Sequence, residues 1–184
     1  MDTLNRLATL IAQRNQTETE VSDLVGHPLK PESLGAYVAS QVFAIDPLEG
    51  TEHLPWTGRF REGSLAGKTV AVQWRLRWDG LLSLSEGTPA EYLLVLAGPE
   101  ALLPPEKGDA SAPWAIESVF LFHLPSLLAS LRDLRRRIGP SAHIPRELWE
   151  SARLLPEGEG AGRLTEEQKQ ALALFSREET LLAC

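Results

Sequence analysis

Residues 56–78, with the sequence WTGRFREGSLAGKTVAVQWRLRW, constrain the fold more strongly than any other part of this chain. They predict a strand, a turn marked by glycine, and a longer second strand. From Thr69 to Arg77 the side chains alternate between two faces, one bearing Val70, Val72 and Trp74 and the other Ala71, Gln73 and Arg75. Such a period of two is typical of a half-buried strand, so we expect a sheet at the centre of the molecule.

The hydrophobic pattern elsewhere predicts helices and further strands around this hairpin. Strands are predicted over residues 92–97, a nearly continuous apolar run, and over residues 119–124. Helices are predicted over residues 4–25, which end at Gly26 and Pro28, and over residues 31–45, 126–138 and 145–155. Helices followed by strands and then by alternating elements indicate an α/β core of about four or five strands.

The domain organisation follows from one polar, glycine-rich stretch. EGEGAG is typical of a flexible linker, which we place at residues 157–164. Residues 1–156 are then a single α/β domain with an N-terminal helix. Residues 165–184 form a C-terminal helix, whose start is marked by the capping-box pattern of Thr165 and Gln168.

Several phrases of the chain resemble a known family. GRFREGSLAGKTVAVQW, YLLVLAGP and ELWESARLLP are similar to an uncharacterised bacterial domain family, and the similarity runs from about Leu34 to Pro156. The helix–strand–strand layout resembles the metal-binding core of the PD-(D/E)XK nuclease superfamily. This resemblance implies a restriction-endonuclease-like core with a mixed central sheet flanked by helices.

The residues that the resemblance marks as catalytic are replaced in this chain. It implies a Glu, an Asp, an Asn and a Lys at four positions, which here are Ala36, Thr57, Ala71 and Gln73. None of these four side chains can bind a divalent cation as a carboxylate does, and none supplies an ammonium group. We therefore expect a nuclease-like shape without nuclease chemistry, and no catalytic residue.

One alternative interpretation retains the nuclease reaction. Asp79 and Glu91 lie nearest the expected cleft, and either could be a relocated ligand of a Mg²⁺-dependent nuclease. The four histidines, in contrast, are scattered and have no second ligand at metal spacing. We expect no metal site and no cofactor.

A basic and aromatic cluster is the candidate nucleic-acid surface. It comprises Arg59, Arg61, Arg75, Arg77 and Trp78, with Trp74 beside them. Arginine can bridge phosphates and tryptophan can stack on a base, with little preference for sequence. The alternative interpretation is that Trp74 packs in the core while the arginines form a solvated strand face.

The C-terminal helix is the candidate protein-binding surface. Its apolar side chains include Leu172, Phe175, Leu181 and Leu182. They either bind a partner or a second copy of the chain, by helix-in-groove recognition, or fold back on the core of their own chain.

Charge and cysteine content limit the remaining function classes. A net charge of −7 opposes indiscriminate binding to nucleic acid. The one cysteine, Cys184, excludes an internal disulfide, and no apolar run approaches the length of a membrane span, so we expect a cytoplasmic protein. The function predicted from the sequence is a catalytically inactive nuclease-like domain that serves as a binding or assembly module. The alternative is the divergent nuclease with relocated metal ligands.

Overall fold

The structure is a computed structural model, and it describes residues 2–26, 29–48, 56–100, 114–156 and 163–176. Within these residues there are five helices and eight strands. The helices are α1 (Asp2–Val25), α2 (Pro31–Val42), α3 (Leu124–Asp133), α4 (Arg146–Ala152) and α5 (Glu166–Ala173). The strands are β1 (Ile45–Pro47), β2 (Thr57–Phe60), β3 (Thr69–Arg75), β4 (Leu81–Leu82), β5 (Tyr92–Ala97), β6 (Ser118–His123), β7 (Ala142–His143) and β8 (Arg153–Leu155).

Six of the described strands form one mixed sheet in the order β1-β2-β3-β5-β6-β8. β3 and β5 run parallel, whereas the other neighbouring pairs in this sheet are antiparallel. β4 and β7 pair separately as a small antiparallel sheet. The predicted mixed α/β class is therefore confirmed, while the expected number of strands was too low. The two edge strands, β1 and β8, have three residues each, which is too short for a visible period of two.

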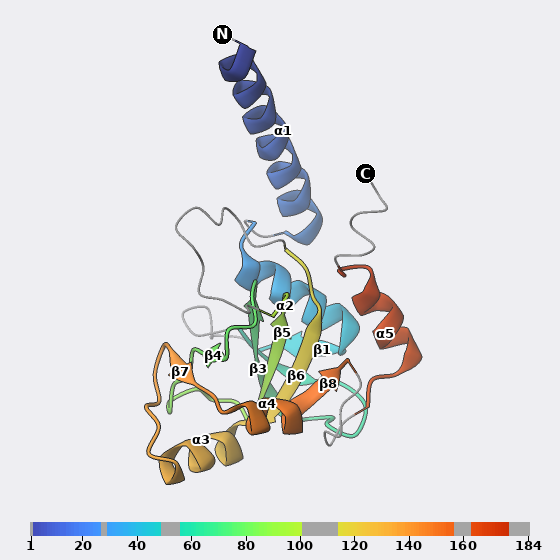
Figure 1. The fold of residues 1–184 in the computed structure, drawn as a ribbon. Helices are drawn as coiled ribbons and strands as arrows, with labels where there is room; N and C mark the ends of the chain where they lie inside the picture. Colours follow the sequence, from blue (N-terminus) through green and yellow to red (C-terminus); the bar gives the residue numbers. More distant parts are fainter. Residues whose placement is uncertain (1, 27–28, 49–55, 101–113, 157–162, 177–184) are drawn as a thin grey trace.

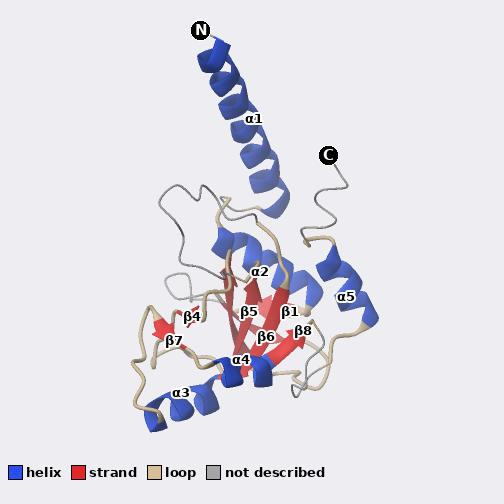
Figure 2. Cartoon of the chain, viewed as in Figure 1, coloured by secondary structure: helices blue, strands red, loops and turns tan. Residues whose placement is uncertain are grey.

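The two faces of the main sheet bury separate sets of side chains. Val70, Val72 and Trp74 of β3 pack with residues of α2 and with Leu172 of α5. Ala71, on the opposite face of β3, packs with residues of α3 and α4. Figure 2 shows the sheet between these helices. The alternation predicted for Thr69 to Arg77 is confirmed as far as Arg75, where β3 ends, and it has an apolar core on both sides.

Three of the predicted helices end too late in the sequence. The helix predicted over residues 126–138 is α3, which ends at Asp133, and Arg135 then adopts a positive φ of 52°. The other two helices end early because the chain turns into a strand there. Ile45 is not on α2: α2 ends at Val42, and Ala44 adopts a positive φ of 50° before β1 begins. Residues 153–155 are not the last turn of α4 but strand β8, which pairs with β6. Both segments take their structure from pairing with distant strands, which local helical spacing does not reveal.

Helix α1 extends away from the layered body, with the N-terminus at its far end (Figure 1). It ends where predicted, at Gly26, whose positive φ of 75° is the conformation that glycine adopts most readily after a helix. The N–H of Gly26 donates a hydrogen bond to Ser22 O at 2.8 Å, closing the last turn. Among the described helices, none is both long enough and apolar enough to cross a bilayer.

Candidate functional site

The structure brings together three of the four positions that the nuclease resemblance marks. Thr57 of β2 and Ala71 of β3 are direct partners in the antiparallel pair, and Gln73 lies two residues further along the same face. Ala36 does not join them, because α2 covers the opposite face of the sheet. There α2 lies so close to β3 that a Cβ at Gly35 would be 2.8 Å from Trp74 Cβ. The four positions therefore do not converge on one point.

The space above these three strand positions is filled by the chain itself. Leu82 and Leu84 are buried in the same core cluster as Ala71. The side-chain amide of Gln73 binds the backbone of Ser83 at both ends: Nε2 donates to Ser83 O, and Oε1 accepts from Ser83 N at 3.3 Å. Thr57 and Ala71 are each 1% exposed. These residues do not fit a divalent cation, because they offer no carboxylate and are covered by a packed segment.

Asp79 and Glu91 cannot replace the missing ligands together. Glu91 immediately precedes β5 beside Thr69, to whose backbone oxygen its N–H donates, whereas Asp79 follows the far end of β3. A seven-residue strand spans about 20 Å between its first and last residues. Among the described residues, no group of three or more His, Cys, Asp or Glu side chains lies close enough to hold a metal ion.

Each of these two carboxylates instead binds a neighbouring cation. Asp79 Oδ2 accepts a hydrogen bond from Arg75 Nη2 at 3.1 Å, and Asp79 Oδ1 accepts one from the N–H of Leu81, also at 3.1 Å. Glu91 Oε1 accepts one from Lys68 Nζ at 2.8 Å. This hydrogen bond from Lys68 holds the pKa of the Glu91 carboxyl below its usual value and raises the pKa of Lys68. Both carboxylates thus have local structural partners.

The four arginines of the candidate nucleic-acid surface lie near opposite ends of β3. Arg59 is the register partner of Thr69, at the start of the strand, and Arg61 follows soon after β2 ends. Arg75 is the last residue of β3, and Arg77 lies two residues beyond it. Arg61 also donates to Asp46 at 2.9 Å, and Arg75 donates to Asp79. The arginines therefore form two separated groups, and acids partly neutralise both.

Trp78 is not available to stack on a base, because it is 8% exposed and its ring lies in the core. The ring centroid is 5.3 Å from that of Phe120 and 5.8 Å from that of Trp149. The guanidinium of Arg153 lies 5.0 Å from the same ring. Trp74 is also buried, as the alternative interpretation of this cluster expects.

The described part of the C-terminal segment folds back on its own core, but its helix is shorter than predicted, because α5 ends at Ala173 and residues 174–176 are not helical. Thr165 and Gln168 form the predicted capping box. Gln168 Nε2 also donates to Val42 O at 3.2 Å, which links α5 to α2. Leu172 is 0% exposed, so it is not accessible to a partner, and Phe175 is partly buried against the same cluster. Leu181 and Leu182 lie outside the described residues.

The predicted linker also contributes to the core. Its residues 157–162 lie outside the described part of the chain. Leu164, however, is buried in the cluster shared by α2 and α5. The segment that leads into α5 is thus anchored by at least one apolar side chain before the helix begins.

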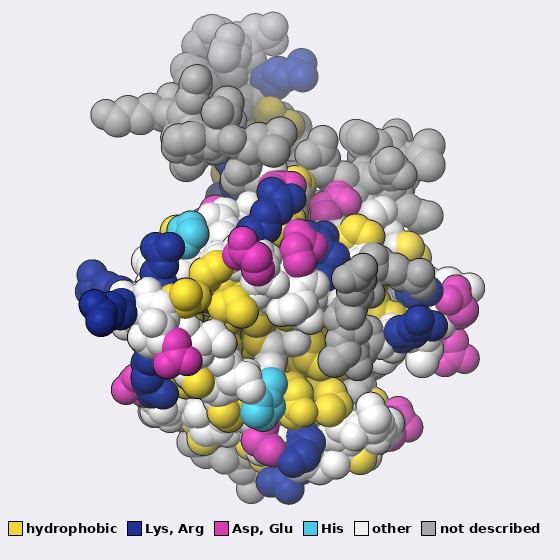
Figure 3. Space-filling model, turned by 60° about the horizontal axis from the view of Figure 1, so that its bottom comes forward, with side chains coloured by type: hydrophobic (Ala, Val, Ile, Leu, Met, Phe, Trp, Pro, Cys, Tyr) yellow, Lys and Arg dark blue, Asp and Glu magenta, His cyan; other side chains and the backbone are white. Residues whose placement is uncertain are grey.

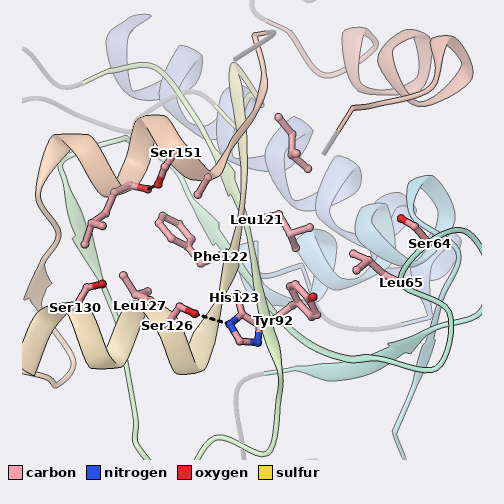
Figure 4. Close-up of a pocket in the computed structure, with 13 residues that line it drawn as sticks. Ser64, Leu65, Tyr92, Leu121, Phe122, His123, Ser126, Leu127, Ser130 and Ser151 are labelled. Atoms are coloured by element: carbon pink, nitrogen blue, oxygen red, sulfur yellow. Dashed lines mark hydrogen bonds between the residues drawn. The ribbon is translucent and has the colours of Figure 1, made fainter. Parts of the chain in front are cut away.

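The face that carries α3 and α4 bears a shallow groove of about 410 Å³. Figure 3 shows apolar side chains gathered on this part of the surface, with charged side chains around them. Inside the groove, His123 Nδ1 lies 2.7 Å from Ser126 Oγ, and the ring of Tyr92 packs on the imidazole (Figure 4). His123 precedes α3 and Ser126 lies in its first turn, so their contact belongs to the start of this helix. Both side chains are exposed to solvent.

The apolar surface of α1 was not among the sites predicted from the sequence. Four large apolar side chains of this helix are at least half exposed: Leu7 (51%), Leu10 (52%), Ile11 (50%) and Leu24 (75%). Their helical spacing was visible in the sequence, but it gave no sign that the body of the molecule would leave them uncovered. A run of 24 helical residues before the first glycine was the available signal, because such a helix is long for a small domain.

Comparison of this chain with family models, with curated proteins and with solved structures found no match. The resemblance to the PD-(D/E)XK superfamily therefore stays a prediction from the sequence, and the function has to be inferred from the geometry of the described residues.

Proposed function

We propose that this protein is a non-catalytic binding and assembly module, and that α1 is its contact element. The observation that carries the proposal is the half-exposed apolar stripe of Leu7, Leu10 and Ile11 on a helix that projects from the body. Contiguous exposed apolar surface of this kind marks interaction sites.

Energetics favour a covered α1. Fully burying an exposed leucine or isoleucine stabilises by about 1.5–3 kcal/mol, so completing the burial of a half-exposed side chain contributes on the order of 1 kcal/mol. Several such side chains lie on one helix. Helices without tertiary packing are only marginally stable in water, so a partner would also stabilise the helical conformation itself.

The nuclease-like positions support the non-catalytic part of the proposal. Thr57, Ala71 and Gln73 are neutral and lie beneath a packed segment, and Asp79 and Glu91 are bound to Arg75 and Lys68. Phosphodiester hydrolysis of the nuclease type needs metal ions to activate water and to stabilise charge, and these residues offer no common ligand set. With a single cysteine and no internal disulfide, we place the assembly in the cytoplasm.

A site-specific photo-cross-linker tests the assembly function in cells that make the full chain. The probe replaces Leu10, on the apolar stripe, and in a matched control it replaces Gln16, an exposed polar residue of the same helix. We expect a cross-linked product from position 10 and none from position 16. The absence of a product from position 10, or equal products from both, would overturn the assembly function.

A plasmid-cleavage assay with Mg²⁺ and with Mn²⁺, before and after chelation, tests the non-catalytic part. We expect no metal-dependent cleavage. Cleavage that requires metal and is lost in Asp79→Asn or Glu91→Gln would establish the divergent nuclease instead.

A further inference from the structure

One row of residues on α1, which includes Leu7 and Ile11 of the apolar stripe, has the spacing of a coiled-coil seam. Leu7, Ile11, Arg14, Glu18, Val21 and Val25 follow one another at alternating steps of four and three residues. This spacing keeps one side of a helix facing a neighbouring helix over its whole length. The helix has 24 residues and is about 36 Å long, which is enough for three heptads.

The chemistry of the seam is symmetric about its middle. Leu7 and Ile11 are apolar at one end, Val21 and Val25 are apolar at the other, and the centre holds Arg14 and Glu18. If a second copy of α1 lies antiparallel, Leu7 meets Val25 of the second copy and Ile11 meets Val21. Arg14 of each copy then meets Glu18 of the other. Apolar residues thus meet apolar residues in the outer layers, and residues of opposite charge meet in the two central layers.

A parallel arrangement in register does not give this match. It places Arg14 opposite Arg14 of the second copy, and Glu18 opposite Glu18. Like charges placed directly opposite each other across an interface oppose association. The sequence of the seam therefore selects the antiparallel direction.

Two apolar side chains beside the seam would also contact each other in the antiparallel pair. Leu10 and Leu24 flank it on one side and are 52% and 75% exposed. In the antiparallel arrangement Leu10 of one copy lies beside Leu24 of the other, because both flank the layers formed by Leu7, Ile11 and their partners. The most exposed apolar residues of the helix are thus the ones that this arrangement covers.

Within one chain, Arg14 and Glu18 interact weakly. Their closest atoms, Arg14 Nη2 and Glu18 Oε2, are 3.7 Å apart, and the side chains are 80% and 43% exposed. An exposed pair of this kind, with the cation on the N-terminal side, contributes little to a helix. Both side chains therefore remain accessible to opposite charges on a second helix.

The base of α1 offers room for the end of the second helix. Val25, the last residue of the seam, lines a hollow of about 260 Å³ together with Tyr37, Pro47 and Trp56. In the antiparallel arrangement the first turns of the second copy lie next to Val25, and so next to this hollow. The bodies of the two copies then lie at opposite ends of the helix pair.

We infer that the occupant of the α1 stripe is α1 of a second copy, in an antiparallel pair with Arg14 and Glu18 joined across the interface. This inference rests on the proposed assembly function and specifies its partner.

Sedimentation or light scattering of the full chain measures the association. We expect the wild-type chain to be dimeric. Arg14→Glu and Glu18→Arg each place two like-charged pairs in the interface, so each should weaken dimerisation about 100-fold or more. The double variant, Arg14→Glu with Glu18→Arg, restores opposite charges and should recover the dimer. Arg6→Glu, a charge reversal on α1 outside the seam, is the matched control and should leave the dimer intact.

Cysteine cross-linking determines the direction in a Cys184→Ser background. Chains with Ile11→Cys and chains with Val21→Cys should form a disulfide when mixed, because these positions meet in the antiparallel pair. Ile11→Cys alone should form none, since the two copies of residue 11 are then about 15 Å apart along the axis. A disulfide from Ile11→Cys alone, or a failure of the double charge reversal to recover the dimer, would overturn the antiparallel pairing.

The two proposals fail in distinguishable ways. If the full chain is monomeric at high concentration, and the probe at position 10 still gives a product whose mass differs from twice that of the chain, the second-copy inference is overturned and the assembly function stands. If the chain is monomeric and position 10 gives no product, both are overturned. Circular dichroism of each variant shows whether it remains folded, which we expect because the reversed side chains are exposed.

Discussion

α1 and α5 lie near the two ends of the sequence, and both carry apolar side chains at helical spacing. The side chains of α1 remain half exposed, whereas Leu172 of α5 is buried in the core beneath the sheet. α5 is held by a capping box, by the hydrogen bond from Gln168 to Val42, and by Leu164 just before it. α1 extends beyond the body (Figure 1). Apolar spacing therefore identifies a helix face that has to be covered, but it does not identify what covers that face.

The largest expected difference in stability is between a variant with a charge placed in the body and a variant with a charge placed on α1. Thr57→Asp puts a carboxyl at a position that is 1% exposed. Burial of a carboxyl can raise its pKa by about 3–5 units, which corresponds to about 4–7 kcal/mol of lost stability at neutral pH. Leu10→Asp should change the stability of the monomer by less than about 0.5 kcal/mol. Urea denaturation at low protein concentration measures both.

The sign of the pH dependence gives a second test of Thr57→Asp. Because burial raises the pKa of the new carboxyl, the lost stability should be partly regained as the pH falls below that raised value. A variant whose stability does not change with pH relative to wild type would show that this position opens to water.

The next effect compares matched truncations on the two helices. Leu172→Ala leaves a cavity beneath α5 and should lower the free energy of unfolding by about 2–5 kcal/mol. Leu7→Ala removes a half-exposed side chain and should cost the monomer less than about 0.5 kcal/mol. Equal losses in thermal or urea unfolding would contradict the difference between the two helices.

A smaller difference in stability is expected between two glutamine-to-alanine variants, one on α5 and one on α1. Gln168 accepts from Thr165 N and donates to Val42 O, so Gln168→Ala removes a cap and a tertiary hydrogen bond and should cost about 1 kcal/mol. Gln16 of α1 donates from Nε2 to Glu20 Oε1, one turn along the same exposed helix face, and Gln16→Ala should be nearly neutral. Urea midpoints of the two variants distinguish these outcomes, and a larger loss from Gln16→Ala would reverse the comparison.

The smallest expected effect concerns the ion pair of Lys68 and Glu91 on the body, whose side chains are about as exposed as those on α1. In Lys68→Met the carboxyl of Glu91 loses its hydrogen bond, so the pKa of Glu91 should rise toward its usual value. The lowered pKa means that any stabilisation by the pair is present above the usual pKa of glutamate and is lost as the pH falls through the lowered value. NMR titration of Glu91 measures the change, and an unaltered pKa would show that Lys68 is not its cause.

Three elements that local signals define were predicted well from the sequence. The apolar run from Tyr92 to Ala97 has the predicted bounds as β5, because Gly98 and Pro99 follow it directly. The end of α1 at Gly26 and the capping box at Thr165 were also predicted. In each case neighbouring residues are sufficient to determine the structure.

The parts that depend on distant contacts could not be predicted. The strand β8 forms because residues 153–155 pair with β6, and the turn before β1 depends on a positive φ at an alanine. At the nuclease-like positions, the spacing of Ala71 and Gln73 correctly indicated a shared face. It did not indicate that α2 would place Ala36 on the other face, or that Leu82 and Leu84 would cover the strand.

The bond between Gln73 and the backbone of Ser83 limits what protein engineering could achieve in this chain. A lysine at position 73 could donate to Ser83 O but could not accept from Ser83 N, so introducing it would leave a backbone donor without its present acceptor. The segment across the strand would also have to be rerouted before solvent, an ion or a phosphodiester could reach the sheet. Converting this scaffold into a hydrolase would therefore require redesign of a whole loop in addition to point substitutions.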